Sequence, residues 1–326
     1  MAVRIALIAL VTLWGATWAT PLPEYLAQTY PKDPDYFVSY QNVISERDKM
    51  AALEAHPDPV EFDKEIQVAA VEQAEAALRQ ARVSAAKEAL EDYWAVHQAC
   101  LNLEIAQINL QLAELELQET ELKLQAGFGS TTALYQAQNE SQTAHAELNK
   151  YLDQLRVAQS AAPIETETLP TPPDLPPGLD IRRNPEYLQK QHEYLVALKE
   201  DVAYSTAEYS TVASKEKERT VRERSTELAS IIQTKQQDLE AKLADLEAAQ
   251  LELALAEEAI QIAEAELEAA LTKQASGAVD PADPQAGTLK DVLAKRITLG
   301  QKQLERESKA KDVWQYWLDA LEYGGI

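Results

Sequence analysis

The sequence predicts an all-α, elongated protein built from long-helix hairpins and coiled coils. Ala, Leu, Glu and Gln dominate the 326 residues and aromatic residues make up only 6%, a composition typical of long helices rather than of a thick globular core. Pro and Gly, which interrupt helices, are absent from Val60 to Ala126 and from Glu186 to Ser276. At 1.5 Å per residue, these stretches predict helices of up to about 100 and 135 Å.

The charge of the chain excludes one large class of partner. Its 54 Asp and Glu residues outnumber its 30 Lys and Arg residues, which gives a net charge of −24. Proteins that bind nucleic acid need excess cationic side chains to neutralise phosphates. We therefore expect no nucleic-acid partner.

The N-terminus predicts export. Met1 to Arg4 carries positive charge, residues 5–14 are apolar, and Thr17-Trp18-Ala19 resembles a cleavage site, so residues 1–19 are interpreted as a signal peptide, with an uncleaved anchor as the alternative. No later segment has the roughly 18 uncharged apolar residues of a membrane helix, which predicts a periplasmic protein with no transmembrane span in the mature chain. Cys100 is the single cysteine, so no intrachain disulfide is possible, and it is expected to be a small buried apolar residue.

Two halves of the chain align with a shift of about 150 residues, which indicates an internal duplication. Gly127 falls on Gly277, and Pro34-Asp35-Tyr36 matches Pro185-Glu186-Tyr187 with a shift of one residue more. Leucines of low-complexity helices align by chance, but the matching glycines and Pro-acid-Tyr starts favour duplication. The predicted domains are helical hairpin repeat 1 (20–162), a stiff Pro-rich linker (163–184) and helical hairpin repeat 2 (185–326).

Each repeat is expected to contain a long helix, a turn and a shorter return helix. Ser130 and Thr131 are predicted to cap the first return helix, which then runs to about Ser160. Thr288 is predicted to cap the second, which runs to about Tyr323.

Two apolar rows follow opposite sides of each long helix. Their centres lie about 155° apart on a helical wheel. In repeat 1 the rows are Leu101, Ile108, Leu115 and Leu122, and Leu103, Leu110, Leu117 and Leu124; in repeat 2 they are Leu239, Leu246, Leu253, Ile260 and Leu267, and Ala248, Leu251, Leu255, Ile262 and Ala265. A helix with two such rows has a neighbour on each side, as in a curved wall or tube; a layered three- or four-helix bundle is the alternative. One chain with four main helices would leave rows uncovered, which predicts a homo-oligomer.

The turn sequences carry a resemblance to a known family. The stretch 124–138, with Gly127, Phe128 and Gly129, resembles the hairpin tip of TolC-type outer-membrane efflux proteins, and residues 288–294 look like its second copy. Residues 183–188 are similar to the opening of each family repeat. The resemblance implies a helical tunnel made of three protomers, whose tips meet the adaptor proteins of an inner-membrane pump, and association with the outer membrane of a diderm bacterium.

The sequence departs from that family at one place in each repeat. The family inserts two long strands before each long helix; here repeat 1 has only His56-Pro57-Asp58-Pro59, and repeat 2 has no break. Residues 215–219 carry five consecutive charges, which a lipid-facing strand would not tolerate. We therefore expect a TolC-like helical domain without a β-barrel. The family's acidic pair at the tunnel entrance is half present, because Asp291 matches but Ala294 replaces the second carboxylate.

The hairpin tips are the predicted partner-binding sites. The candidate residues are Gly127, Phe128, Gly129, Ser130 and Thr132 in tip 1, and Gly277, Val279, Thr288, Leu289, Asp291 and Val292 in tip 2. Gly127 and Gly277 would each permit the left-handed backbone conformation that ends a helix. Phe128 is expected either to pack locally against the return helix, the preferred interpretation, or to contact a partner.

Catalytic chemistry is not predicted. The four histidines are scattered, without metal-ligand spacing, and the sequence shows neither a phosphate-binding Gly loop nor a nucleophile elbow. We therefore expect no enzyme activity, no cofactor and no metal. The aromatic residues of the last helix are expected to fill a seam, with a partner surface as the alternative; they are Trp314, Tyr316, Trp317 and Tyr323.

The sequence suggests three functional hypotheses. The first is a non-enzymatic periplasmic conduit or docking component of an efflux or export assembly. The alternative is a structural coiled-coil spacer or scaffold without transport. The hypothesis that the protein is a pump adaptor is the least favoured, because adaptors flank their hairpin with β-rich modules that this sequence lacks.

Overall fold

The computed structural model describes residues 22–56, 60–162, 169–206, 211–276 and 288–325. In these ranges the chain is helical apart from short turns and the linker segment 169–180, and it contains no strand. The predicted all-α class is confirmed. The elements in chain order are α2 (Leu22–Thr29), the 3₁₀ turn η1 (Tyr30–Lys32), α3 (Pro34–Glu54), α4 (Glu61–Gln125), α5 (Thr131–Ala161), the 3₁₀ turn η2 (Ile181–Arg183), α6 (Pro185–Thr206), α7 (Thr211–Ser276) and α8 (Leu289–Tyr323).

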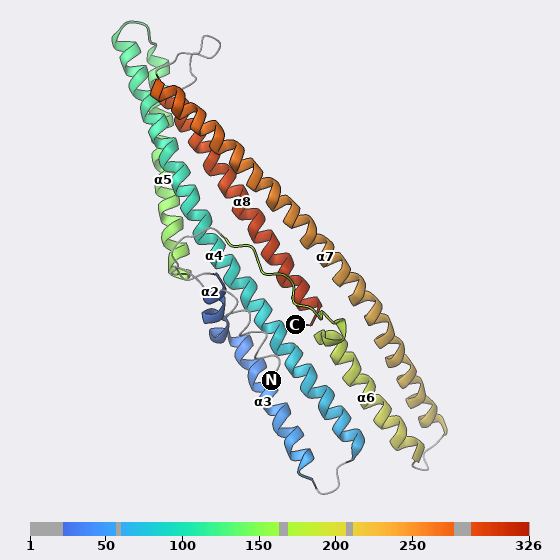
Figure 1. Cartoon of the computed structure of the whole chain (residues 1–326). Helices are drawn as coiled ribbons and strands as arrows, with labels where there is room; N and C mark the ends of the chain where they lie inside the picture. Colours follow the sequence, from blue (N-terminus) through green and yellow to red (C-terminus); the bar gives the residue numbers. More distant parts are fainter. Residues whose placement is uncertain (1–21, 57–59, 163–168, 207–210, 277–287, 326) are drawn as a thin grey trace.

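The helices form an elongated wall (Figure 1). In the upper half of the view, α4 packs between α5 and α8, and α8 packs on α7; in the lower half, α4 contacts α3 and α6, and α6 contacts α7. Neighbouring helices are antiparallel. The wall therefore has two long edges, one formed by α3 and α5 and the other by α7.

The stretch from Glu186 to Ser276, which contains neither Pro nor Gly, forms two helices. The prediction that it is one uninterrupted helix is therefore wrong. Helix α6 ends at Thr206 and α7 begins at Thr211. The ion pairs between them, Glu200–Lys217, Glu193–Arg224 and Glu186–Lys235, show that the chain reverses. The reversal needs neither Pro nor Gly: the segment around it is rich in Ser, Thr and Tyr, which are weaker helix formers than Ala or Leu.

The two halves of the chain contain helices of similar lengths in the same order. Helices α3, α4 and α5 contain 21, 65 and 31 residues, and α6, α7 and α8 contain 22, 66 and 35. Each set is a hairpin of a short and a long helix followed by a return helix. The common origin of the two halves stays a prediction.

The main core lies where the linker and α2 cover the wall. Trp314 and Trp317 are buried in a T-shaped pair with ring centroids 5.5 Å apart, and they pack in one cluster with Leu90, Tyr93 and Leu169. The interpretation of these tryptophans as seam residues is confirmed. Cys100 packs, partly buried, against the same cluster.

The Pro-rich linker is fastened along α8 by polar contacts. The buried Glu307 carboxylate accepts a hydrogen bond from the Leu169 backbone N–H at 2.8 Å, and Arg306 donates to the Leu169 carbonyl at 2.8 Å. The Trp314 indole N–H donates to the Pro170 carbonyl at 2.5 Å. At the other end of the linker, Asp180 N–H donates to the Gly324 carbonyl at 2.9 Å. Glu307 is only 3% exposed, and this burial raises the pKa of its carboxyl group.

One carboxylate joins three helices of the wall. Asp319 of α8 lies 2.7 Å from Lys87 of α4 and 3.0 Å from Lys242 of α7. Burial alone would raise the pKa of Asp319, but the hydrogen bonds from the two lysines outweigh it and lower the pKa. These two ion pairs link α8 to α4 and to α7 and so favour one axial alignment of the three helices.

Candidate functional site

The first hairpin tip is a closed turn built from the end of α4. Gly127 has φ +81°; its N–H donates to the Leu124 carbonyl at 3.0 Å, and the Phe128 N–H donates to the Lys123 carbonyl at 2.9 Å. This pair of bonds is the Schellman motif, which satisfies the last carbonyls of a helix through a left-handed residue. The predicted role of Gly127 in ending the helix is confirmed.

Gly129 and Ser130 start the return helix. A Cβ atom on Gly129 would lie 2.7 Å from the Leu124 backbone nitrogen, so the close return of the chain requires glycine here. The Ser130 hydroxyl accepts a hydrogen bond from the Ala133 N–H at 3.1 Å, which confirms the predicted cap. Thr132, one residue inside α5, is exposed.

Phe128 projects from this turn into solvent. Its exposed fraction is 89%, so the expectation that it packs against the return helix is wrong. The backbone at Gly129 returns close to Leu124 at the end of α4, and the Phe128 side chain lies outside this turn. An aromatic ring this exposed is available for a partner.

The end of α7 and the start of α8, which flank the second tip, lie at the same end of the molecule as the first tip (Figure 1). Thr288 caps α8 by accepting a hydrogen bond from Asp291 N–H at 3.2 Å, as predicted, and Lys290 lies 2.9 Å from Glu119 near the end of α4. Leu289 is half exposed, whereas Val292 is only 4% exposed. The prediction that Val292 offers a contact surface does not fit this burial. Gly277 and Val279 lie outside the described residues.

The two apolar rows of the long helices are covered to different extents. On α4 both rows are mostly half-buried, since α5 and α8 flank this helix. On α7 the first row, with Leu246 and Leu253, is buried against α8. Of the second row, Leu251, Leu255 and Ile262 are 64%, 56% and 62% exposed. The predicted uncovered row is therefore present on α7.

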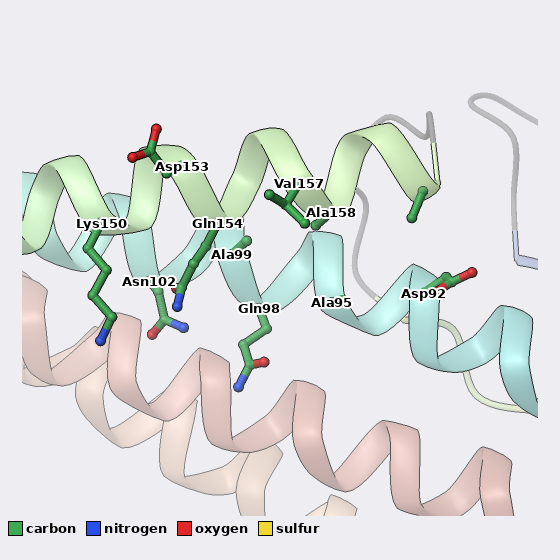
Figure 2. Close-up of a pocket in the computed structure, with 11 residues that line it drawn as sticks. Asp92, Ala95, Gln98, Ala99, Asn102, Lys150, Asp153, Gln154, Val157 and Ala158 are labelled. Carbon is green, nitrogen blue, oxygen red and sulfur yellow. The ribbon is translucent and has the colours of Figure 1, made fainter.

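A wide groove of about 820 Å³ runs between α4 and α5. Figure 2 shows Gln98 and Asn102 of α4 and Lys150 of α5 on the same side of it. The remaining lining is mainly alanine, with Val157, Gln154 and the acidic Asp92 and Asp153. The groove is therefore lined by small, amide and charged side chains.

The described residues give no sign of a metal centre. They contain no group of three or more His, Cys, Asp or Glu side chains arranged to hold an ion. His97, the most buried histidine, stacks on Tyr93 at 4.8 Å. Burial lowers the pKa of His97 to about 4, so this histidine is neutral at pH 7. The sequence had offered no sign of this burial.

Within the same described ranges, none of the helices combines the length and apolar character that crossing a membrane requires.

Comparisons with known proteins identify the fold. No protein-family model and no curated protein matches the chain. Solved structures do: the outer membrane channel CmeC of Campylobacter jejuni (TM-score 0.65, 9% identity, 94% of this chain and 86% of that one) and CusC, a transmembrane channel (TM-score 0.62, 13% identity, 93% and 95%). The outer membrane protein VceC of Vibrio cholerae is similar as well (TM-score 0.59, 13% identity, 94% and 96%).

These neighbours are TolC-type outer membrane channels, so the chain has the helical fold of that class. The resemblance that the tip sequences indicated is confirmed at the level of fold.

Proposed function

We propose that this protein is a non-enzymatic periplasmic component of an efflux or export assembly, acting as a segment of the conduit or as its docking collar. The observation that carries this proposal is the wall of antiparallel helices with an uncovered apolar row along one edge. Such a wall buries its rows only when it is continued by further helices. The similarity to outer membrane channels in fold supports a conduit as the continued form.

The proposal includes the organisation predicted from sequence. Residues 1–19 direct export, the hairpin repeats 20–162 and 185–326 descend from one duplicated unit, and 163–184 link them. The protein is a homo-oligomer, with a trimer implied by the family resemblance. It works at the outer membrane side of a diderm envelope.

The hairpin tips are the proposed docking sites for periplasmic adaptor or pump proteins. Both tips lie at one free end of the wall, and Phe128 presents an exposed ring there. Aromatic side chains dominate protein–protein interfaces because they bury a large apolar area when they dock. The remaining tip 1 residues, Gly127, Gly129, Ser130 and Thr132, shape the turn that carries this ring.

The substitution Phe128→Ser tests the docking role. We expect capture of partner proteins from envelope extracts to fall at least about tenfold, the loss typical of an aromatic anchor. Helicity and melting temperature should not change, because the Phe128 side chain is almost fully exposed and buries little area against the rest of the chain. Quantitative pull-down and circular dichroism measure the two effects.

Val38→Ser is the matched control, since Val38 is also exposed but lies on α3, far from the tips. Capture should survive this change. Undiminished capture by Phe128→Ser would contradict the docking role and leave the scaffold hypothesis as the better one.

A further inference from the structure

A cluster of arginine side chains lies where α4 passes the end of the linker. Arg79 and Arg82, one turn apart on α4, are both half-buried, and Arg183 in η2 is exposed. The Arg79 guanidinium donates a hydrogen bond to the Arg183 backbone carbonyl at 3.3 Å. This bond joins the two segments and brings their cationic groups to one place.

The cluster has no carboxylate partner. Within the described ranges, none of its three arginines forms an ion pair, and Glu75, the acid one turn before Arg79, lies 2.5 Å from Arg47 instead. Burial lowers the pKa of the Arg79 guanidinium; Glu75 raises it, and the positive charges of Arg183 and Arg82 lower it further. The cluster therefore lacks negative charge, although acids outnumber bases 54 to 30 in the chain.

Two tyrosine rings hold the Arg82 guanidinium in position. It lies over Tyr30 and Tyr36, with distances of 5.8 and 5.4 Å to the ring centroids, and it donates to the Tyr36 hydroxyl at 3.4 Å. Such cation–π contacts orient a guanidinium without neutralising its charge. Arg82 is thus fixed in place and still able to attract an anion.

The hydrogen bonding of the cluster is also incomplete. The ε nitrogens of Arg79 and Arg82 are buried and have no acceptor among the residues that the structure describes. A guanidinium offers five N–H donors, and a buried donor without an acceptor destabilises the fold. The cluster thus lacks acceptor atoms as well as negative charge.

We propose that Arg79, Arg82 and Arg183 form a binding site for a phosphate group, carried by a soluble ligand or by a lipid headgroup. Phosphate suits the site because its oxygens can accept paired hydrogen bonds from more than one guanidinium at once. The exposed Arg183 leaves one side of the site open to solvent. A bound phosphate would bridge α4 of repeat 1 and η2 at the start of repeat 2.

The acidic character of the whole chain does not exclude this ligand. The net charge of −24 repels anions at long range. Salt screens that repulsion beyond about 8 Å at physiological ionic strength, so the arginines decide the potential at the site. The inference goes beyond the proposed function and does not depend on it.

Calorimetric titration of the full chain with inorganic phosphate, at an ionic strength matched with sodium chloride, tests the site. We expect saturable binding of one phosphate per chain and a melting temperature that rises with phosphate. Arg79→Gln and Arg183→Gln should each weaken binding at least about tenfold, because each removes a charge-assisted contact. Arg222→Gln is the matched control, since exposed Arg222 lies on α7 and pairs with Glu218; its binding should match the parent chain.

Melting in sodium chloride alone separates this role from a structural one. Arg183 is exposed, and its removal relieves repulsion within the cluster, so Arg183→Gln should melt at the parent temperature or above it. The rise with phosphate should disappear in this variant. A lower melting temperature in sodium chloride, with an undiminished rise on adding phosphate, would show that Arg183 serves the fold alone.

Co-sedimentation with phosphatidylcholine vesicles that contain phosphatidylglycerol identifies the source of the phosphate. Sedimentation of the parent chain that is lost in Arg183→Gln supports a lipid headgroup. Binding of inorganic phosphate without sedimentation supports a soluble ligand. Absence of both signals, or equal binding by the parent chain, Arg79→Gln and Arg183→Gln, would overturn the proposal.

Discussion

Replacing Trp314 with alanine is expected to lower the free energy of unfolding by about 3–5 kcal/mol, the range for removing a large buried aromatic side chain. Trp314 is 1% exposed, packs on Trp317, and donates a hydrogen bond to the Pro170 carbonyl. Its loss leaves a cavity under the linker and an unpaired carbonyl in the same place. Helix α8 and the linker would both lose their main attachment.

Urea unfolding followed by circular dichroism measures this effect. Trp314→Phe is the matched control, because it keeps a buried aromatic ring while it removes the indole N–H and part of the buried volume; we expect it to cost roughly 1–2 kcal/mol. A loss below about 1 kcal/mol for Trp314→Ala would mean that the linker attachment is not part of the stable core.

The second large effect is acid sensitivity caused by His97. The pKa of this imidazole is about 4 in the folded chain, against an ordinary value of 6.5, because burial disfavours the charged form. The unfolded chain therefore binds the proton more readily. Above pH 6.5 His97 does not lower the free energy of unfolding. As the pH falls from 6.5 toward 4, protonation of His97 in the unfolded chain lowers the free energy of unfolding by about 3 kcal/mol in all.

His97→Phe keeps a ring beside Tyr93 and removes the titration, so its stability should fall less over the same pH range. Glu307 acts in the opposite direction, since its raised pKa removes stability as the pH rises; comparing the variant with the parent chain at each pH cancels that contribution. Denaturation at pH 7, 5.5 and 4.5 measures the difference. Parallel curves for the two proteins would contradict the assignment.

Local signals in the sequence were sufficient to predict α4, α5 and α8. Gly127 and Gly129 with Ser130 mark the first turn because the required backbone conformations and the cap are properties of those residues themselves. The reversal between Thr206 and Thr211 was missed because it contains neither Pro nor Gly. There, packing of α6 against α7 decides the structure, and helix propensity alone does not reveal it.

The docking surfaces were predictable only in part. The heptad row of α7 is visible in the sequence, but its exposure depends on which helices of the chain reach it. The sequence does not show that Phe128 points into solvent, because this depends on how closely the backbone at Gly129 returns to the end of α4. The linker contacts of Glu307 and Trp314 join residues more than a hundred positions apart, and no local pattern indicates them.

Electron microscopy of the purified protein, viewed along the helix axes, tests the central claim that copies of this wall build a conduit. We expect a closed ring of copies around an open centre. Isolated rods in which α5 and α7 of one chain cover each other, with no central opening, would contradict it.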